Sequence, residues 1–118
     1  MSTGGQSLDI EVDPEQLADW ILDDPELQLI DVREGYEREA GHIAGSRHIP
    51  LVELSAQANT IESSRAVVFY CRVGARSEMA AKAFRASGYQ AFSMQGGLVR
   101  WAAEQRPLSP ADGHVANH

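Results

Sequence analysis

Cysteine is almost missing from this chain, which has 118 residues and a single thiol at Cys71. One thiol excludes a disulfide within the chain and a metal site built from several cysteines. The sequence also lacks an apolar run long enough to cross a bilayer, and no basic stretch followed by an apolar segment opens it. We therefore expect neither a membrane span nor a secretory signal. Because a free thiol persists in a reducing compartment, a cytoplasmic protein is expected.

Basic residues are scarce as well. The 10 lysines and arginines are outnumbered by 17 aspartates and glutamates, and the net charge is −7 at pH 7. An acidic chain binds nucleic acid and anionic membranes poorly, so we expect neither as a partner. A small anionic ligand would need a local cluster of positive charge that opposes the global field. Arg72 and Arg76, close to Cys71, are the residues that would form this cluster.

The length of the chain and its hydrophobic content of 43% fit one domain with a substantial core. A disordered leader is predicted over residues 1–7 (MSTGGQS) and the folded domain over residues 8–106. Residues 107–118 are predicted to be a flexible tail, because Pro107 and Pro110 interrupt the helical pattern there. No internal repeat or low-complexity segment divides the domain further.

Apolar segments with the length of strands alternate with helical patterns along the chain. Strands are predicted over residues 10–12, 27–32, 47–49, 66–70 and 89–94. Helices are predicted to begin near Pro14, Pro50, Ser77 and Gly97. Gly88 is expected to end the helix that Ser77 caps. This order favours an α/β fold with a mostly parallel central sheet and helices on both of its faces.

The stretch VVFYCRVGARS carries Cys71 at the end of an apolar strand, where the chain turns into a helix. Ligands of parallel sheets bind beyond these carboxyl ends. Backbone N–H groups of the loop, the helix N-terminus, Arg72 and Arg76 would together favour a thiolate and a bound anion. Gly74 permits the backbone conformation of a tight cradle. A lone cysteine is often only a small buried apolar residue, but this combination favours a nucleophile at Cys71.

Four motifs in order resemble the single-domain rhodaneses, a family of sulfurtransferases. They are LIDVRE (29–34), GHIAGSRHIP (41–50), CRVGARS (71–77) and GGLVRW (96–101). The second departs from the family pattern at Ser46, where alanine is commoner. The resemblance implies a rhodanese-like fold over the folded domain.

The resemblance also implies a chemistry. Cys71 would take a sulfur atom from a small anionic donor such as thiosulfate, become a persulfide, and pass the sulfur to cyanide or to a thiol. Such a double displacement predicts ping-pong kinetics. A protein is a further expected acceptor. Neither a metal nor an organic cofactor is expected, since the nucleophile carries the transferred group.

The loop after the nucleophile is expected to bind the substrate through Arg72, Val73, Gly74, Ala75, Arg76 and Ser77. Arg72 is either a ligand of the donor or a solvated surface residue. Arg76 is expected to brace the loop by pairing with Asp31, which ends a neighbouring strand. Arg33 is expected to pair with Glu37 in the same supporting layer. Mutations in this layer would loosen the loop without removing a reacting group.

Two other functions share this kind of loop. Phosphatases and arsenate reductases of the same fold have five residues between cysteine and arginine, whereas four separate Cys71 from Arg76. The tighter loop suits one sulfur atom better than a tetrahedral phosphoryl group. A persulfide carrier that acts with a protein partner would have the same loop, so this alternative stays open beside the enzyme. The sequence also leaves open the physiological donor and acceptor and the oligomeric state.

Overall fold

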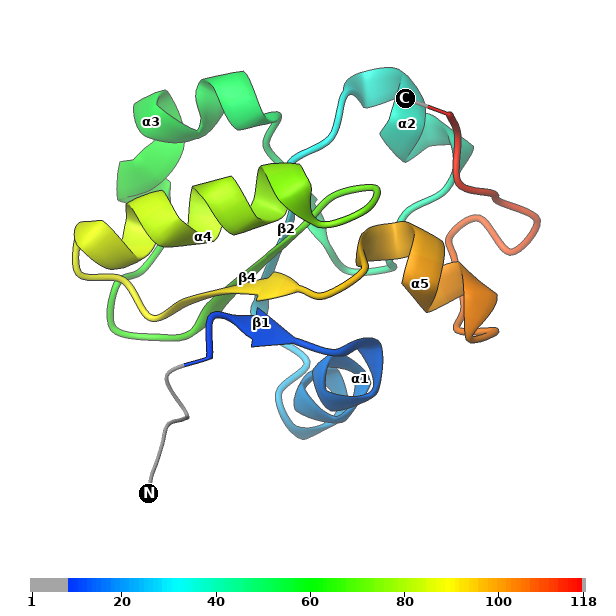
Figure 1. Cartoon of the computed structure of the whole chain (residues 1–118), viewed down its shortest axis with the longest axis horizontal. Coiled ribbons are helices and arrows are strands. Elements are labelled where there is room, and N and C mark those ends of the chain that lie inside the picture. Colours follow the sequence, from blue (N-terminus) through cyan, green and yellow to red (C-terminus); the bar gives the residue numbers. More distant parts are fainter. Residues whose placement is uncertain (1–8, 118) are drawn as a thin grey trace.

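The computed structural model describes residues 9–117, so the predicted leader over residues 1–7 lies outside the described part. A five-stranded parallel sheet forms its centre, in the order β1-β5-β4-β2-β3 (Figure 1). The strands are β1 (Glu11–Val12), β2 (Gln28–Asp31), β3 (Arg47–His48), β4 (Val67–Tyr70) and β5 (Ala91–Met94). All five fall within or beside the predicted ranges. The most apolar strand, β4, occupies the middle of the sheet, as expected for a strand buried on both faces.

Helices connect the strands. They are α1 (Pro14–Asp23), α2 (Gly35–Ala40), α3 (Leu54–Gln57), α4 (Ala75–Ala86) and α5 (Gly97–Ala103), with 3-10 turns at η2 (Leu51–Glu53) and η3 (Ala58–Thr60). No pattern in the sequence predicted α2. Its sequence GYEREA has no apolar periodicity, and a capping box between Glu34 and Glu37 starts it.

Local signals set two of the helix ends. The Asp13 side chain accepts a hydrogen bond from Gln16 N at 2.8 Å, and Pro14 follows in the first turn, so this predicted start is confirmed. Gly88 has φ +93° just beyond the end of α4, as predicted. The predicted cap at Ser77 is wrong, because α4 begins at Ala75 and Ser77 lies inside its first turn.

Helices cover both faces of the sheet, which confirms the predicted α/β architecture (Figure 1). The alternation of side chains along β4 divides the core into two layers. On one face Val67 and Phe69 pack with residues of α3 and α4. On the other face Val68 and Tyr70 pack with residues of α1 and α5. The carboxyl ends of the strands therefore open between these helix layers.

The segment after α5 lies against the domain, where the sequence predicted a flexible tail. Leu108 and Val115 pack on the α1/α5 layer of the core. Ser109 exchanges two backbone hydrogen bonds with His42, and His114 N donates to Ala40 O at 2.9 Å. Leu108 and Val115 are too far apart in the sequence to form a recognisable pattern. Within residues 9–117, no helix has the length and apolarity needed to cross a bilayer.

Candidate active site

Cys71 is the first residue after β4, and it is 1% exposed. Two backbone N–H groups point at its sulfur, with Gly74 N at 3.1 Å and Ser77 N at 3.4 Å from Sγ. The hydroxyl oxygen of Ser77 lies 3.5 Å from the same sulfur. Gly74 has φ +112°, a conformation that side chains resist, and this turns the loop back over the sulfur. The sulfur thus lies in a concave group of donors that favours negative charge.

The first turn of α5 holds the loop from behind. Leu98 N donates to the carbonyl of Cys71 at 2.8 Å, and Val99 N donates to the carbonyl of Arg72 at 3.0 Å. These bonds satisfy N–H groups that a helix start leaves without intrahelical partners. Gly97 packs so closely on the backbone of residues 72 and 73 that a Cβ atom there would lie 2.6 Å from Val73 N. The GGLVRW motif therefore positions the loop by main-chain contact.

A hollow of about 280 Å³ opens over Cys71. It is lined by the predicted loop residues Cys71, Arg72, Val73, Ala75 and Arg76. Arg72 is partly buried, and its Nε donates to the carbonyl of Ala116 at 3.3 Å. The Nη atoms of Arg72 make no hydrogen bond within residues 9–117.

Arg76 braces the loop through Glu37 on α2. Its Nη1 and Nη2 donate to the two carboxylate oxygens of Glu37, both at 2.9 Å. The side chain of Glu37 is 0% exposed and that of Arg76 is 19% exposed. The hydrogen bonds to Glu37 raise the pKa of Arg76 despite its partial burial. Arg76 therefore stays cationic beside the sulfur while its fork is held by the carboxylate.

A second buried ion pair lies at the end of β2. Arg33 donates to Asp31 from Nε at 2.9 Å and from Nη2 at 2.8 Å, and both side chains are 0% exposed. Burial opposes the charge of Arg33, but the bonds to Asp31 outweigh it and the pKa of Arg33 is raised. The predicted pairs Arg76–Asp31 and Arg33–Glu37 are therefore wrong, since the two arginines exchange partners. The reason is geometric: Arg33 folds back on its own strand end, and Glu37 comes from the helix that was not predicted.

Tyr70 and Arg38 extend this layer beneath the loop. The Tyr70 hydroxyl accepts from Ile43 N at 3.0 Å and lies 2.9 Å from Ser46 Oγ. Burial, with the charge of Asp31 adding to it, raises the pKa of Tyr70 to about 12. Arg38 donates to Ser46 O and also reaches Asp31. No sequence pattern marked Tyr70 or Arg38 as supports of the Cys71 loop. Their hydrogen-bond partners lie in other segments, outside any local motif.

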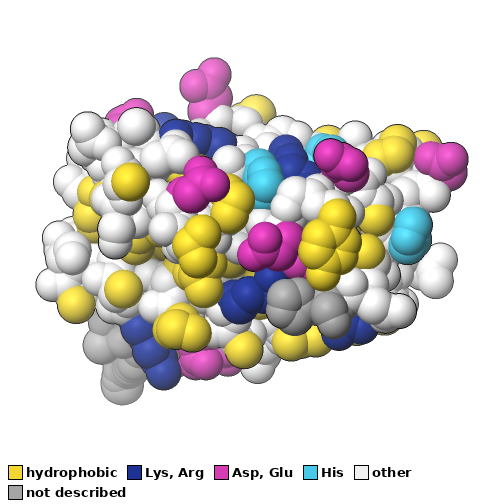
Figure 2. All heavy atoms as spheres, turned by 90° about the horizontal axis from the view of Figure 1, so that it is seen from above, with side chains coloured by type: hydrophobic (Ala, Val, Ile, Leu, Met, Phe, Trp, Pro, Cys, Tyr) yellow, Lys and Arg dark blue, Asp and Glu magenta, His cyan; other side chains and the backbone are white. Residues whose placement is uncertain are grey.

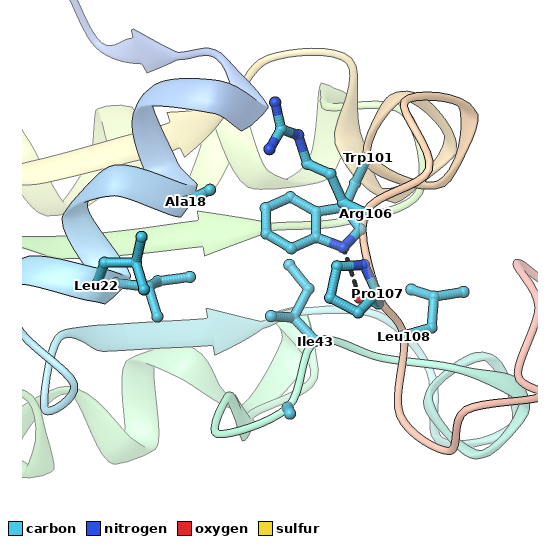
Figure 3. A pocket seen from close by; sticks show the side chains of 9 residues that line it. Ala18, Leu22, Ile43, Trp101, Arg106, Pro107 and Leu108 are labelled. Carbon is cyan, nitrogen blue, oxygen red and sulfur yellow. Dashed lines mark hydrogen bonds between the residues drawn. The ribbon is translucent and has the colours of Figure 1, made fainter.

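A second hollow, of about 330 Å³, lies between α1, the chain around Ile43 and the segment after α5 (Figure 3). Trp101 points into it, and its Nε1 donates to Pro107 O at 2.8 Å. Arg106 is the charged residue of the lining, 5.8 Å from the centre of the Trp101 ring. Although this hollow is the larger of the two, it contains no nucleophile or acid. The candidate active site is therefore the hollow at Cys71.

Residues 13–104 match the family described as "Rhodanese-like domain". The chain belongs to the rhodanese-like domain family. The four motifs of the sequence and the parallel sheet agree with this membership. The resemblance inferred from the sequence is thereby confirmed.

Relatives of this rhodanese-like domain include proteins of different length. "Uncharacterized protein YqhL" of Bacillus subtilis is 41% identical over 78 residues, which are 65% of this chain and 62% of YqhL. A "Sulfurtransferase" of Allochromatium vinosum is 31% identical over 104 residues, 87% of this chain and 97% of that protein. This chain thus spans less than two thirds of YqhL but nearly the whole of the second relative.

Solved structures show the same fold. The crystal structure of a rhodanese-related protein from Thermoplasma volcanium superimposes with a TM-score of 0.76 at 28% identity. The match covers 83% of this chain and 95% of that one. This chain therefore has the fold of the family. Cys71 lies at the carboxyl end of its central strand, β4.

Proposed function

We propose that this protein is a sulfurtransferase of the thiosulfate type, with Cys71 as its nucleophile. The observation that carries the proposal is the pair of backbone donors, Gly74 N and Ser77 N, aimed at Cys71 Sγ. These donors favour the thiolate, and the hollow above them gives access to a small anion. A relative covered almost completely by the match is itself named a sulfurtransferase.

The reaction consists of two displacements. The Cys71 thiolate attacks the outer sulfur of thiosulfate, the S–S bond of the donor breaks, and its electron pair leaves with sulfite. The enzyme keeps the anionic persulfide Cys71–S–S⁻. Cyanide or a thiolate then attacks the terminal sulfur, and the bonding pair returns to Cys71 as thiolate. Each step breaks one bond to sulfur as it forms another, so it balances without an oxidant or a reductant, and ping-pong kinetics follow.

Each part of the site has a role in this proposal. The N–H groups stabilise the anionic sulfur in its thiolate and persulfide forms. Arg72, with Nη atoms facing no protein acceptor in the described chain, binds the sulfonate end of the donor. Arg76 supplies positive charge while Glu37 fixes its position. Asp31 and Arg33 form the buried ion pair at the end of β2 that supports this arrangement from below. Because the chemistry needs a reduced thiol, a cytoplasmic setting suits it.

The test is the mass of the intact protein under non-reducing conditions, before and after incubation with thiosulfate. The wild type is expected to gain one sulfur atom, to lose it on addition of cyanide, and to release thiocyanate. Cys71→Ser is the matched control and is expected to gain nothing. If a folded wild type with a free thiol gains no sulfur from thiosulfate, the proposed donor class is wrong.

A persulfide carrier that hands sulfur to a protein is the second candidate. Apolar side chains are exposed on and near the loop, with Val73 53% and Met79 61% exposed. Figure 2 looks down on the face that carries α3 and α4 and shows apolar side chains at the surface between charged ones. A protein acceptor would cover such residues, whereas cyanide would not. A persulfide that loads once but resists discharge by cyanide and glutathione would favour this candidate over the enzyme.

A further inference from the structure

Ser93 is a buried polar residue on a core strand. It lies in β5, is 0% exposed, and is paired in register with Phe69 of β4. Its neighbour two residues earlier, Ala91, belongs to the apolar layer beneath α4, so Ser93 projects to the side of the reactive loop. A hydroxyl buried without a partner would cost free energy there. Its partner is the hydroxyl of Ser77, with the two oxygens 2.7 Å apart.

The protons around Ser77 can be counted. Its Oγ lies 2.7 Å from Ser93 Oγ, 3.5 Å from Cys71 Sγ and 3.2 Å from Gly74 O, and it has one proton to donate. The Gly74 carbonyl already accepts from Glu78 N at 2.9 Å. The proton of Ser77 is therefore not required by Gly74 and can serve the sulfur or Ser93.

The direction of these bonds depends on the charge of the sulfur. When Cys71 is a thiol, S–H donates to Ser77 Oγ, and Ser77 donates onward to Ser93. When the sulfur is an anion, it can only accept, so Ser77 must donate to it. The lone pairs of Ser77 then accept the proton of Ser93. Ser93 is thus the acceptor of this pair in the thiol state and its donor in the anionic state.

We propose that Ser93 is a positioning residue of the sulfur site: it turns the Ser77 hydroxyl toward Cys71 Sγ whenever that sulfur is anionic. The inference rests on the proposed function, which needs an anionic thiolate and persulfide. The backbone donors at Gly74 and Ser77 are fixed, so the hydroxyl is the one donor of the three that responds to charge. Without Ser93, the lone pairs of Ser77 lose their donor, so the Ser77 hydroxyl is less polarised and held less firmly, and its bond to the anionic sulfur weakens.

The experiment is alkylation of Cys71 by iodoacetamide, which needs no sulfur donor and so separates this inference from the proposed function. Ser93→Ala is expected to slow alkylation about threefold near pH 6.5, because the anionic sulfur loses part of the Ser77 hydrogen bond. The two rates are expected to converge near pH 10, well above the ordinary pKa of about 8.5 for a thiol, where stabilisation of the anion matters less. Met94→Leu is the matched control on the same strand. It changes packing on the opposite face and is expected to follow the wild type at both pH values.

Two further variants make the test strict. Ser93→Thr keeps the hydroxyl and is expected to restore the rate near pH 6.5. In a Ser77→Ala background, Ser93→Ala is expected to have no further effect, because Ser93 acts through Ser77. A Ser93→Ala protein that matches the wild type, or that is slowed equally at every pH, overturns the inference. So does a loss of rate on Ser93→Ala that persists without the Ser77 hydroxyl. Failure of thiosulfate loading alongside the expected alkylation pattern overturns the proposed donor alone.

Discussion

The ion pair between Arg76 and Glu37 makes a quantitative prediction about stability. Glu37 is fully buried, while Arg76 is 19% exposed, so the two partners are not equivalent. Arg76→Met leaves a buried carboxylate without its cation and is expected to lower the free energy of unfolding by about 3–5 kcal/mol. Glu37→Gln keeps an acceptor for Glu34 N and leaves an arginine that can reach water, so about 1–2 kcal/mol is expected.

The double variant Glu37→Gln/Arg76→Met is the decisive member of the series. It no longer buries a carboxylate at position 37 without its arginine, so it is expected to be more stable than Arg76→Met alone. Urea unfolding followed by circular dichroism gives the free energy of unfolding of all three proteins. In a thermal scan, each kcal/mol lost would lower the melting temperature of a domain of this size by about 4 °C. A cycle of Asp31→Asn with Arg76→Met is the control and is expected to couple far less. Additive losses for Glu37 and Arg76 would refute the reasoning.

Two more substitutions test the loop support and the buried tyrosine. Gly97→Ala is expected to lower the free energy of unfolding by more than about 2 kcal/mol and to lower the reactivity of Cys71. The reason is that φ of Gly97 is +62° and a Cβ atom would press on the backbone of Arg72. Gly35→Ala, with open space around it, is the control and should stay within about 0.5 kcal/mol of the wild type. For Tyr70, a folded-state pKa of about 12 against an ordinary 10 means that stability is fully present below about pH 10. Up to about 3 kcal/mol is then lost as the pH rises toward 12. Tyr70→Phe should show a shallower loss in urea titrations across this range, and equal slopes would contradict the assignment.

Local patterns in the sequence predicted most of the scaffold. The strands and the starts of α1 and α5 rest on short-range signals, namely apolar runs, Asp13-Pro14 and paired glycines, which act within a few residues. The loop around Cys71 was predicted for the same reason, since a nucleophile, a glycine and two arginines lie within one short stretch. The helix α2 was missed because its start depends on two glutamates and not on an apolar face.

Partner choice in the supporting layer was beyond the sequence. Asp31, Arg33, Glu37 and Arg76 were all selected, but which acid meets which base depends on how strand ends and helices meet in space. Each arginine could satisfy its charge with either acid, so composition and spacing leave the choice open. Ser93 was not selected at all, because a serine in a strand carries no pattern until a second hydroxyl is found beside it.

The two edges of the sheet have a consequence for behaviour in concentrated solution. Both edge strands, β1 and β3, are two residues long. Exposed strand edges act as templates on which other chains add, so such short edges give a neighbouring molecule little backbone to extend. The segment with the strongest tendency to form intermolecular β-structure, Val67–Tyr70, lies in the centre and is paired on both sides. The strand that leads into Cys71 is thus also the one best shielded from aggregation.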